Sequence, residues 1–265
     1  MAFMSVNGIS LYYEVHGSGE PLLLIQGLGY PCEMWFAQVP AFSKEFTTII
    51  FDNRGSGRSG KPDEEYTIRQ MAGDAIALLN NLGASSAHIL GVSLGGLIAQ
   101  EMAIEFPERV KKLVLISTHY GTGYWEATKA VWDEILSMTS GTLEEILREK
   151  LKFVLTPEYY RRQWKSITEI IRIRSLTPQP PHAFIRQFEA AKKFDARERV
   201  KLITAPTLVL SGTEDRVVPL ALSQQLALQV TNSRFCAIDR AAHLAFIEKA
   251  DEINQLVLQF LKSQE

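Results

Sequence analysis

The sequence predicts an α/β protein with a mostly parallel, twisted sheet of about eight strands, helices on both faces of the sheet and an inserted helical lid. Three observations support this fold class. Short, continuous apolar runs recur along the chain, as in strands that are covered on both faces. Helical stretches separate these runs, and this alternation is typical of parallel strands joined by right-handed crossovers. Between residues 119 and 199 the alternation stops, and the chain becomes helix-like throughout.

The predicted strands begin near the start of the chain. Gly8 separates two short runs, and the second of them, Ile9–Val15, is rich in β-forming residues. Six further strands follow, five of them continuous apolar runs and the last one weaker. They are Leu22–Ile25, Thr47–Phe51, Ala87–Leu90, Leu113–Ile116, Thr207–Leu210 and Phe235–Ile238.

Three stretches between or after these strands have apolar residues at helical spacing. In Ile68–Asn81 the apolar positions recur every three or four residues, and Gly83 provides a stop signal. Leu97–Phe106 is apolar nearly all round, as a buried helix is, and ends before Pro107. Ala250–Lys262 has one apolar stripe and is the last predicted helix.

Residues 119–199 also differ in composition from the rest of the chain. They hold three of the four tryptophans, and their 14 basic and 11 acidic residues give a net charge of +3, against −5 for the remainder. Three prolines, Pro178, Pro180 and Pro181, interrupt the stretch. We interpret it as a helical lid inserted between the sixth and seventh strands, with residues 1–118 and 200–265 forming the α/β core.

Composition and charge exclude several classes of function. The 265 residues are 46% hydrophobic and 22% charged, as in an ordinary globular protein. A net charge of −2 gives no electrostatic footprint for nucleic acid or an anionic membrane surface. No apolar run approaches the roughly 20 residues that span a bilayer, and residues 1–5 do not read as a secretory leader. We expect a cytoplasmic protein without nucleic-acid or membrane partners.

The cysteines and histidines indicate no metal site. Cys32 and Cys236 are far apart and have neither metal-ligand nor CxxC spacing, so free thiols are expected. The five histidines are scattered, and no Cys/His/Asp cluster has ligand spacing. The chemistry predicted below requires no cofactor.

The most informative motif is Gly91-Val92-Ser93-Leu94-Gly95-Gly96, which lies between a predicted strand and a predicted helix. G-x-S-x-G in this context is the pattern of a nucleophile elbow. The turn is so tight that side chains two positions before and after the serine would clash, which accounts for Gly91 and Gly95. The Ser93 hydroxyl is then held above the sheet edge, at the positive end of the following helix. Ser93 is the candidate nucleophile, and a glycine-rich connector without chemistry is the alternative.

A serine hydroxyl needs a general base to become a strong nucleophile. His243 follows the weak strand Phe235–Ile238 and precedes the last helix, so it is the candidate base. His119, which closes a predicted strand, is the alternative, although it precedes the candidate acid in the chain. The remaining histidines are expected at the end of a strand, inside a strand and in the lid, namely His16, His88 and His182.

The base in turn needs an acid that fixes its tautomer and stabilises the imidazolium. Asp215 lies just past the carboxyl end of Thr207–Leu210, where ligand-facing residues of an open parallel sheet are found. Its neighbour Glu214 is the alternative acid. Asp52 is expected to be structural.

With these segments in place, the chain resembles the α/β-hydrolase fold family over essentially its whole length. The order Ser93, Asp215, His243 is the Ser–Asp–His order of that family. The other matching pieces are Gln26-Gly27-Leu28-Gly29, the Asp52–Ser59 segment, Gly212–Pro219 and Ala242-His243. The resemblance places a lid after the sixth strand. It also implies that the Asp52–Ser59 segment braces the loops around the site and takes no part in the chemistry.

The resemblance further implies an oxyanion hole made of two backbone N–H groups. One belongs to Leu94, the residue after the nucleophile, and the other to Leu28, the third position of the family's His-Gly-x pattern. Gln26 stands where the family usually has histidine, and a backbone donor tolerates that change.

The predicted reaction is acyl transfer through an acyl-enzyme. His243 takes the Ser93 proton as the hydroxyl attacks a carbonyl, and water later releases the acid. The resemblance implies hydrolysis of a carboxylic ester or lactone of a small, partly apolar substrate, as in carboxylesterases and oxoadipate enol-lactonases. Ser93 excludes the relatives that place an aspartate at the elbow, the haloalkane dehalogenases and epoxide hydrolases.

Other functions remain open on the same chain. Carbon–carbon bond hydrolases and haloperoxidase-like esterases of the family use the same triad, and a hydrolase-fold ligand receptor would rely on the lid instead. A dinucleotide-binding protein is disfavoured, because no third glycine follows Gly27-Leu28-Gly29.

Aromatic residues of two segments are the candidates for substrate contact. Trp35 lies near the predicted oxyanion loop, and Tyr120 and Trp125 begin the lid, so an apolar, partly aromatic group is the natural occupant. Packing within the core or lid is the alternative for each. A substrate carboxylate would require arginines, and solvated helix faces are the alternative for the two candidate pairs, Arg172 with Arg174 and Arg161 with Arg162.

Overall fold

The computed structural model describes residues 2–121 and 123–264 and contains one eight-stranded sheet. The strands are β1 (Ala2–Val6), β2 (Ile9–His16), β3 (Glu20–Ile25), β4 (Phe46–Phe51), β5 (Ala87–Val92), β6 (Val110–Ile116), β7 (Thr207–Gly212) and β8 (Ser233–Ile238). Their order in the sheet is β1-β2-β4-β3-β5-β6-β7-β8. β2 pairs antiparallel with β1 and β4, and all other pairs are parallel. The predicted fold class is confirmed.

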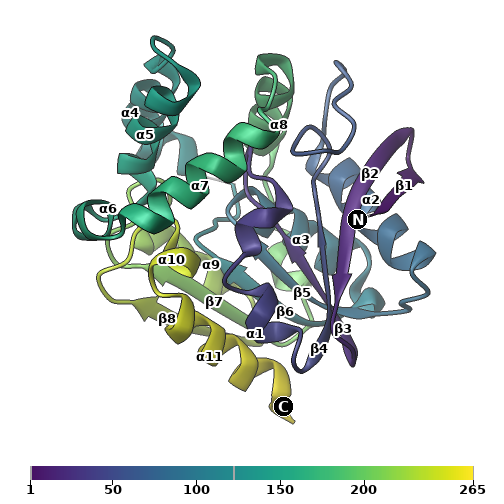
Figure 1. Ribbon diagram of the computed structural model, residues 1–265. Helices are drawn as coiled ribbons and strands as arrows, with labels where there is room; N and C mark the ends of the chain where they lie inside the picture. The colour runs from purple at the N-terminus through teal and green to yellow at the C-terminus, as the bar shows by residue number, and fades with distance from the viewer. Residues whose placement is uncertain (1, 122, 265) are drawn as a thin grey trace.

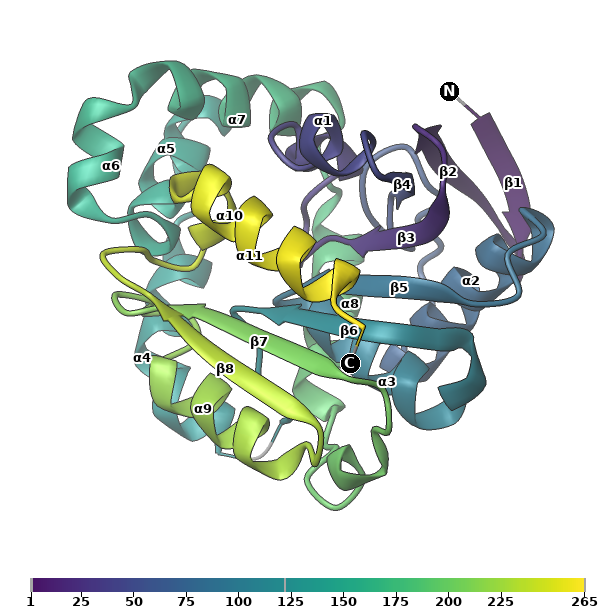
Figure 2. The same cartoon turned by 90° about the horizontal axis from the view of Figure 1, so that it is seen from below.

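Helices cover both faces of this sheet. Outside the segment between β6 and β7 they are α1 (Val39–Phe42), α2 (Ile68–Asn81), α3 (Leu94–Glu105), α9 (Leu220–Gln229), α10 (Ala245–Glu248) and α11 (Ala250–Lys262). Three short 3₁₀ helices, η1 (Cys32–Trp35), η2 (Pro107–Arg109) and η3 (Val200–Leu202), lie in the connections. Figure 2 shows α11 across one face of the sheet and α3 and α9 across the other.

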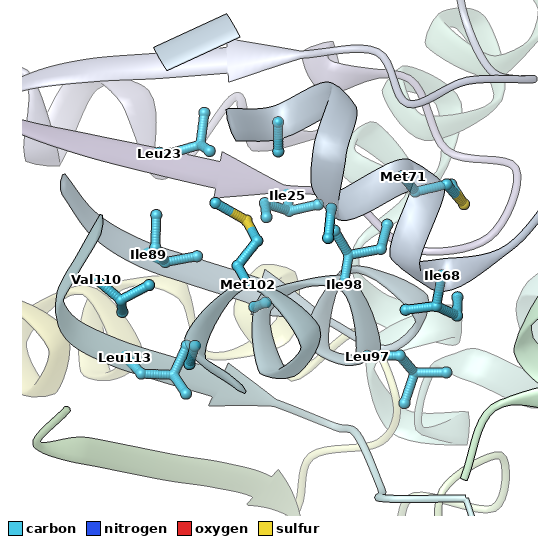
Figure 3. Close-up of a cluster of buried hydrophobic side chains, with 14 of the residues drawn as sticks. Leu23, Ile25, Ile68, Met71, Ile89, Leu97, Ile98, Met102, Val110 and Leu113 are labelled. Atoms are coloured by element: carbon cyan, nitrogen blue, oxygen red, sulfur yellow. The ribbon is translucent and has the colours of Figure 1, made fainter. Parts of the chain in front are cut away.

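The strands are continuous apolar runs because both faces of the sheet are buried. Successive side chains of a strand point to opposite faces, so each of them is apolar. Leu23 and Ile25 of β3 join the core under α2 and α3, where Figure 3 shows them beside Met102. Leu22, from the same strand, joins the core on the other face together with Val257 of α11. All five side chains are fully buried.

Five α-helices lie in the described residues between β6 and β7. They are α4 (Tyr124–Ser137), α5 (Leu143–Val154), α6 (Pro157–Arg162), α7 (Trp164–Leu176) and α8 (Pro181–Lys193). Figure 1 shows them gathered in teal and green beyond one end of the sheet. They contact loops that follow strand ends, since the Leu244 N–H after β8 donates to the Val154 carbonyl at 2.9 Å. We refer to these five helices as the lid.

Most predicted elements agree with the structure within one to three residues. α2 and α11 have the predicted bounds, whereas α3 starts at Leu94 and not at residue 97, because Gly95 and Gly96 form part of its first turn. α1 and α9 were not predicted, since neither has a distinct apolar stripe between clear caps. Cys32 and Cys236 are free thiols, as expected. Within residues 2–121 and 123–264 no helix is long and apolar enough to cross a membrane.

Candidate active site

Ser93 occupies the sharp turn between β5 and α3. Its backbone has φ 54° and ψ −119°, a conformation that costs a residue with a side chain about 1–3 kcal/mol. Hydrogen bonds maintain it: the Ser93 N–H donates to the Ile116 carbonyl at 3.0 Å, and the Ser93 carbonyl accepts from the Gly96 N–H and the Thr118 hydroxyl, each at 2.8 Å. The predicted strand–turn–helix elbow is therefore present.

Close contacts require glycine at three positions of the elbow, two of them with backbone and one with a side chain. A Cβ atom at Gly91 would lie 2.2 Å from the Gly95 carbonyl oxygen, which is the predicted clash within the turn. At Gly95 it would lie 2.1 Å from the Ile25 carbonyl oxygen, so this glycine lets β3 approach the helix. At Gly96 it would meet the Thr118 side chain at 2.6 Å. The serine is thus packed tightly between the ends of β3 and β6.

Asp215 and His243 are hydrogen-bonded to each other in the loops after β7 and β8. His243 Nδ1 lies 2.9 Å from Asp215 Oδ2, and both residues are buried. The other carboxylate oxygen accepts the N–H groups of Val217 and Val218, each at 2.8 Å. Because the carboxylate accepts, this hydrogen bond places a proton on Nδ1. Glu214, the alternative acid, is exposed.

The strand-end loops that carry Ser93, Asp215 and His243 are packed against one another. A Cβ atom at Gly212 would lie 2.2 Å from the Ala241 carbonyl oxygen, which also accepts the Glu214 N–H at 2.9 Å. Thr118 joins the β6 end to Ser93, and its carbonyl accepts the Ser223 hydroxyl at 2.7 Å. Among the described residues none is hydrogen-bonded to Ser93 Oγ, so the structure does not form the serine–histidine bond. Such bonds often tighten only when substrate is present.

His119, the alternative base, has a different environment. Its ring stacks on Tyr124 with centroids 3.6 Å apart, and its Nδ1 accepts the Gly121 N–H at 3.0 Å. Burial, followed by the charge of nearby His243, lowers the pKa of His119 to about 3. It therefore stays neutral and holds the lid's first turn beside the predicted base.

The other three histidines bind partners elsewhere in the fold. His16 lies 2.9 Å from Glu14, and His88 lies 3.2 Å from Glu20. His182 on α8 lies 3.0 Å from the Lys61 carbonyl oxygen.

The two predicted oxyanion donors lie on either side of the serine. Leu94 is the first residue of α3, where a helix leaves its N–H groups without internal partners. Leu28 follows Gly27, whose added Cβ would lie 3.3 Å from Ser93 Cβ. Neither N–H has an acceptor among the described residues. Gln26 is buried, its Oε1 accepts the Gly27 N–H at 3.3 Å, and its Nε2 has no partner.

A glutamine of the lid holds this oxyanion loop, which we define as residues 26–30. Gln187 on α8 has no exposed surface, and its Oε1 accepts the Gly29 N–H at 3.1 Å. Its Nε2 donates to the Arg54 carbonyl at 2.6 Å and to the Ser56 hydroxyl at 2.8 Å. Gln179 donates to the same Oε1 at 2.9 Å. No local sequence signal marks Gln187, because all but one of these partners are more than 130 residues away.

Glu248 makes the corresponding connection at the other side of the site. Its carboxylate accepts the Ala242 N–H, next to His243, at 2.7 Å, and the N–H of Thr156 at the start of α6. Burial raises the pKa of Glu248, and these two N–H groups oppose that effect. The loop of His243 and the lid are thereby joined through one carboxylate.

The Asp52–Ser59 segment is a buried scaffold, as the resemblance implied. Asp52 accepts the N–H groups of Cys32 at 2.6 Å and Arg58 at 2.7 Å, and burial raises its pKa. Arg54 forms a two-pronged ion pair with Asp74, at 2.9 and 3.1 Å. The charged groups of Asp52 and Arg54 therefore stabilise the fold of this segment.

The aromatic residues predicted to touch substrate have divergent positions. The prediction that Trp35 contacts substrate is wrong, because its side chain has no exposed surface. Its ring centre lies 4.9 Å from that of Phe246, inside the core behind the loop. Tyr120 packs against the core, and its carbonyl accepts the Ala196 N–H at 2.9 Å. Trp125 belongs to a cluster of lid rings with Tyr124, Trp132 and Phe188.

One group of possible metal ligands exists among the described residues. Cys32, Glu33 and Asp52 offer ligand atoms within 4.8 Å of one another. Asp52 already accepts two backbone N–H groups, and Glu33 pairs with Arg58. Burial and Asp52 raise the pKa of the Cys32 thiol well above its usual value, which disfavours the thiolate that a metal would need. The group is therefore engaged in internal bonds.

Known proteins resemble this chain along nearly its full length. The alpha/beta hydrolase fold family matches residues 20–250. A protein of Azorhizobium caulinodans named as a candidate carbamate hydrolase, RutD, is 31% identical over 94% of each chain. A candidate non-heme bromoperoxidase of Mycobacterium tuberculosis, BpoC, is 30% identical over 96% of this chain and 98% of its own. The enol-lactonase of Burkholderia xenovorans LB400 superposes with a TM-score of 0.89 at 28% identity, over 99% of this chain and 100% of that one.

Proposed function

Because the chain belongs to the alpha/beta hydrolase fold family and is a hydrolase, we propose that it cleaves a carboxylic ester or lactone through an acyl-enzyme on Ser93. The observation that supports this most is the elbow conformation of Ser93 at the sheet edge that also carries the buried Asp215–His243 pair. A strained, fixed serine beside an oriented imidazole is the arrangement that nucleophilic acyl transfer requires.

Each group has a defined part in the proposed reaction. His243 Nε2 takes the hydroxyl proton as Ser93 Oγ attacks the carbonyl carbon, while Asp215 stabilises the resulting imidazolium. The N–H groups of Leu28 and Leu94 donate to the oxyanion, and loss of one such donor typically costs about 2.7–4 kcal/mol of transition-state stabilisation. His243 then protonates the leaving alcohol, and water, activated by the same imidazole, releases the acid and regenerates the serine.

The test compares Ser93→Ala with Ser117→Ala. Ser117 is a fitting control because it also follows a buried strand, has a positive φ of 49° and is fully buried. We expect Ser93→Ala to lose turnover of a p-nitrophenyl acylate and stoichiometric labelling by a fluorophosphonate, whereas Ser117→Ala keeps both. Full turnover by Ser93→Ala would disprove the assignment.

The names of the relatives suggest neighbouring reactions on the same serine. One relative is named as a carbamate hydrolase and another as a bromoperoxidase, and the superposing structure is an enol-lactonase. A turnover screen across simple esters, enol-lactones, carbamates, ring-cleavage diketones and peroxide-dependent halogenation separates them. Fluorophosphonate labelling of Ser93 without any turnover would instead favour a ligand receptor.

A further inference from the structure

Two lid cations among the described residues are both partly buried and without a carboxylate partner. Lys150 lies on α5 and Arg174 on α7, and both are only partly exposed. Across the described parts of the chain neither forms an ion pair with an acidic residue. Arg172, two positions before Arg174, differs in both respects, because it is exposed and binds Glu169 at 2.7 Å.

Both cations lie against aromatic rings beside the oxyanion loop. The Arg174 guanidinium carbon is 4.5 Å from the centre of the Tyr30 ring, and Lys150 Nζ is 5.8 Å from the centre of the Phe184 ring. Phe184 approaches the same loop, since a Cβ atom at Gly29 would lie 3.8 Å from its Cδ2. The rings position the two charges without neutralising them.

The oxyanion loop connects these cations to the nucleophile. The Tyr30 N–H donates to the Gly27 carbonyl at 3.3 Å, which closes a tight turn. Gly27 contacts Ser93 at one end of that turn, and Tyr30 contacts Arg174 at the other. Arg174 and Ser93 therefore contact opposite ends of the same tight turn.

Two like charges held together in a partly buried place repel each other. Burial, and then the charge of Arg174, lower the pKa of Lys150. An anion placed between the two cations would remove this repulsion and gain charge-assisted hydrogen bonds from both. Guanidinium and ammonium groups together match a carboxylate, because one supplies a planar fork and the other a point charge.

We propose that Lys150 and Arg174 bind a carboxylate group of the substrate, several bonds away from the carbonyl that Ser93 attacks. The inference rests on the proposed function and narrows it to half-esters of dicarboxylic acids and to lactones that carry a carboxylate. The aromatic rings beneath the cations would cover the aliphatic linker between the two groups. Of the four arginines that the sequence suggested for a substrate carboxylate, the structure favours Arg174 alone. The other three are exposed. Arg172 is also paired with Glu169, and Arg162 with Glu158.

The kinetic test uses mono-p-nitrophenyl esters of C4 to C8 dicarboxylic acids, each compared with the neutral compound in which an amide replaces the free carboxylate. We expect wild-type protein to prefer the charged compound at one chain length by roughly 10- to 100-fold in kcat/KM. Arg174→Gln and Lys150→Gln should each reduce this preference at least about tenfold, and Arg174→Lys should retain part of it. Arg172→Gln is the matched control and should leave the preference unchanged.

A binding measurement keeps the inference testable if no ester is turned over. Calorimetry on Ser93→Ala should show tighter binding of monomethyl adipate than of methyl 5-carbamoylpentanoate, and Arg174→Gln in that background should abolish the difference. Equal handling of charged and neutral compounds by wild-type protein, in turnover and in binding, would overturn the carboxylate site while the ester hydrolase stands. Charge-selective binding without turnover or Ser93 labelling would retain the site and disprove the proposed function.

Discussion

Replacing Gln187 with methionine tests whether the lid positions the oxyanion loop. Methionine has a similar length and no hydrogen-bonding amide, so the substitution leaves the side-chain volume nearly unchanged. It removes the partners of the Gly29 N–H, the Arg54 carbonyl and the Ser56 hydroxyl, none of which is exposed to water. An unpaired buried backbone group costs about 1–3 kcal/mol. The two backbone groups together predict a loss of about 2–6 kcal/mol in the free energy of unfolding.

At about 2–4 °C per kcal/mol for a chain of this size, this loss should lower the melting temperature by about 4–24 °C. Activity should also fall, because Leu28, the predicted oxyanion donor, is the immediate neighbour of Gly29. A partly displaced donor predicts a decrease of about 10- to 100-fold in kcat/KM at a temperature where the variant is folded. Differential scanning calorimetry and p-nitrophenyl acylate kinetics measure the two effects.

Gln224→Met on α9 is the control, since Gln224 is exposed and its replacement should change stability by no more than about 0.5 kcal/mol. If Gln187→Met melts within 2 °C of wild type, the four hydrogen bonds do not stabilise the fold as argued. If it melts early but the folded variant keeps its full kcat/KM, the lid glutamine supports the fold alone, and its positioning of the oxyanion loop is refuted.

Three further substitutions test separate parts of the site. His119→Asn removes a group whose pKa is lowered to about 3 in the folded protein. In the wild type, the unfolded chain binds a proton at this histidine below about pH 6.5 and the folded chain does not, so the wild type should lose about 1–2 kcal/mol more stability than the variant between pH 7 and 5. Urea titrations at both pH values measure this difference. Glu248→Gln leaves one acceptor for two N–H donors and should lower kcat/KM about tenfold, with Glu252→Gln as an exposed control. Gly95→Ala, with its Cβ 2.1 Å from a backbone oxygen, should not yield folded protein, whereas Gly73→Ala, which meets only Asn7 at 3.8 Å, should melt no lower than wild type.

The sequence predicted the elements and site residues that local chemistry determines. β-forming apolar runs and capped amphipathic helices depend on neighbours within a few residues, and α2 and α11 accordingly have the predicted bounds. The elbow at Ser93 was predictable because its glycines are adjacent in the chain. The hydrogen bond between Asp215 and His243 was predictable only in outline, from their places after the ends of parallel strands.

What the sequence did not predict depends on contacts between distant segments. Gln187 and Glu248 look like ordinary helix residues, and only the folded chain shows their partners. Gln187 accepts the Gly29 N–H and donates to the Arg54 carbonyl, whereas Glu248 accepts the N–H groups of Thr156 and Ala242. Trp35 shows the opposite error, since closeness to the oxyanion loop in sequence did not reveal that its ring points into the core. The direction of a side chain in an irregular loop has no periodicity from which it can be inferred.

Chemistry and selectivity are placed on different parts of this fold but meet at the oxyanion loop. The edge of the sheet carries the proposed nucleophile, base and acid on short loops after β5, β7 and β8, whose close backbone contacts leave little freedom to vary. The lid carries Gln187 and Arg174, which contact residues 29 and 30 of the loop that carries the proposed second oxyanion donor. A lid that positions this loop must therefore affect the rate as well as the choice of substrate. Exchanging the lid for that of a relative should consequently alter kcat together with KM, and a change confined to KM would show that the two parts act independently.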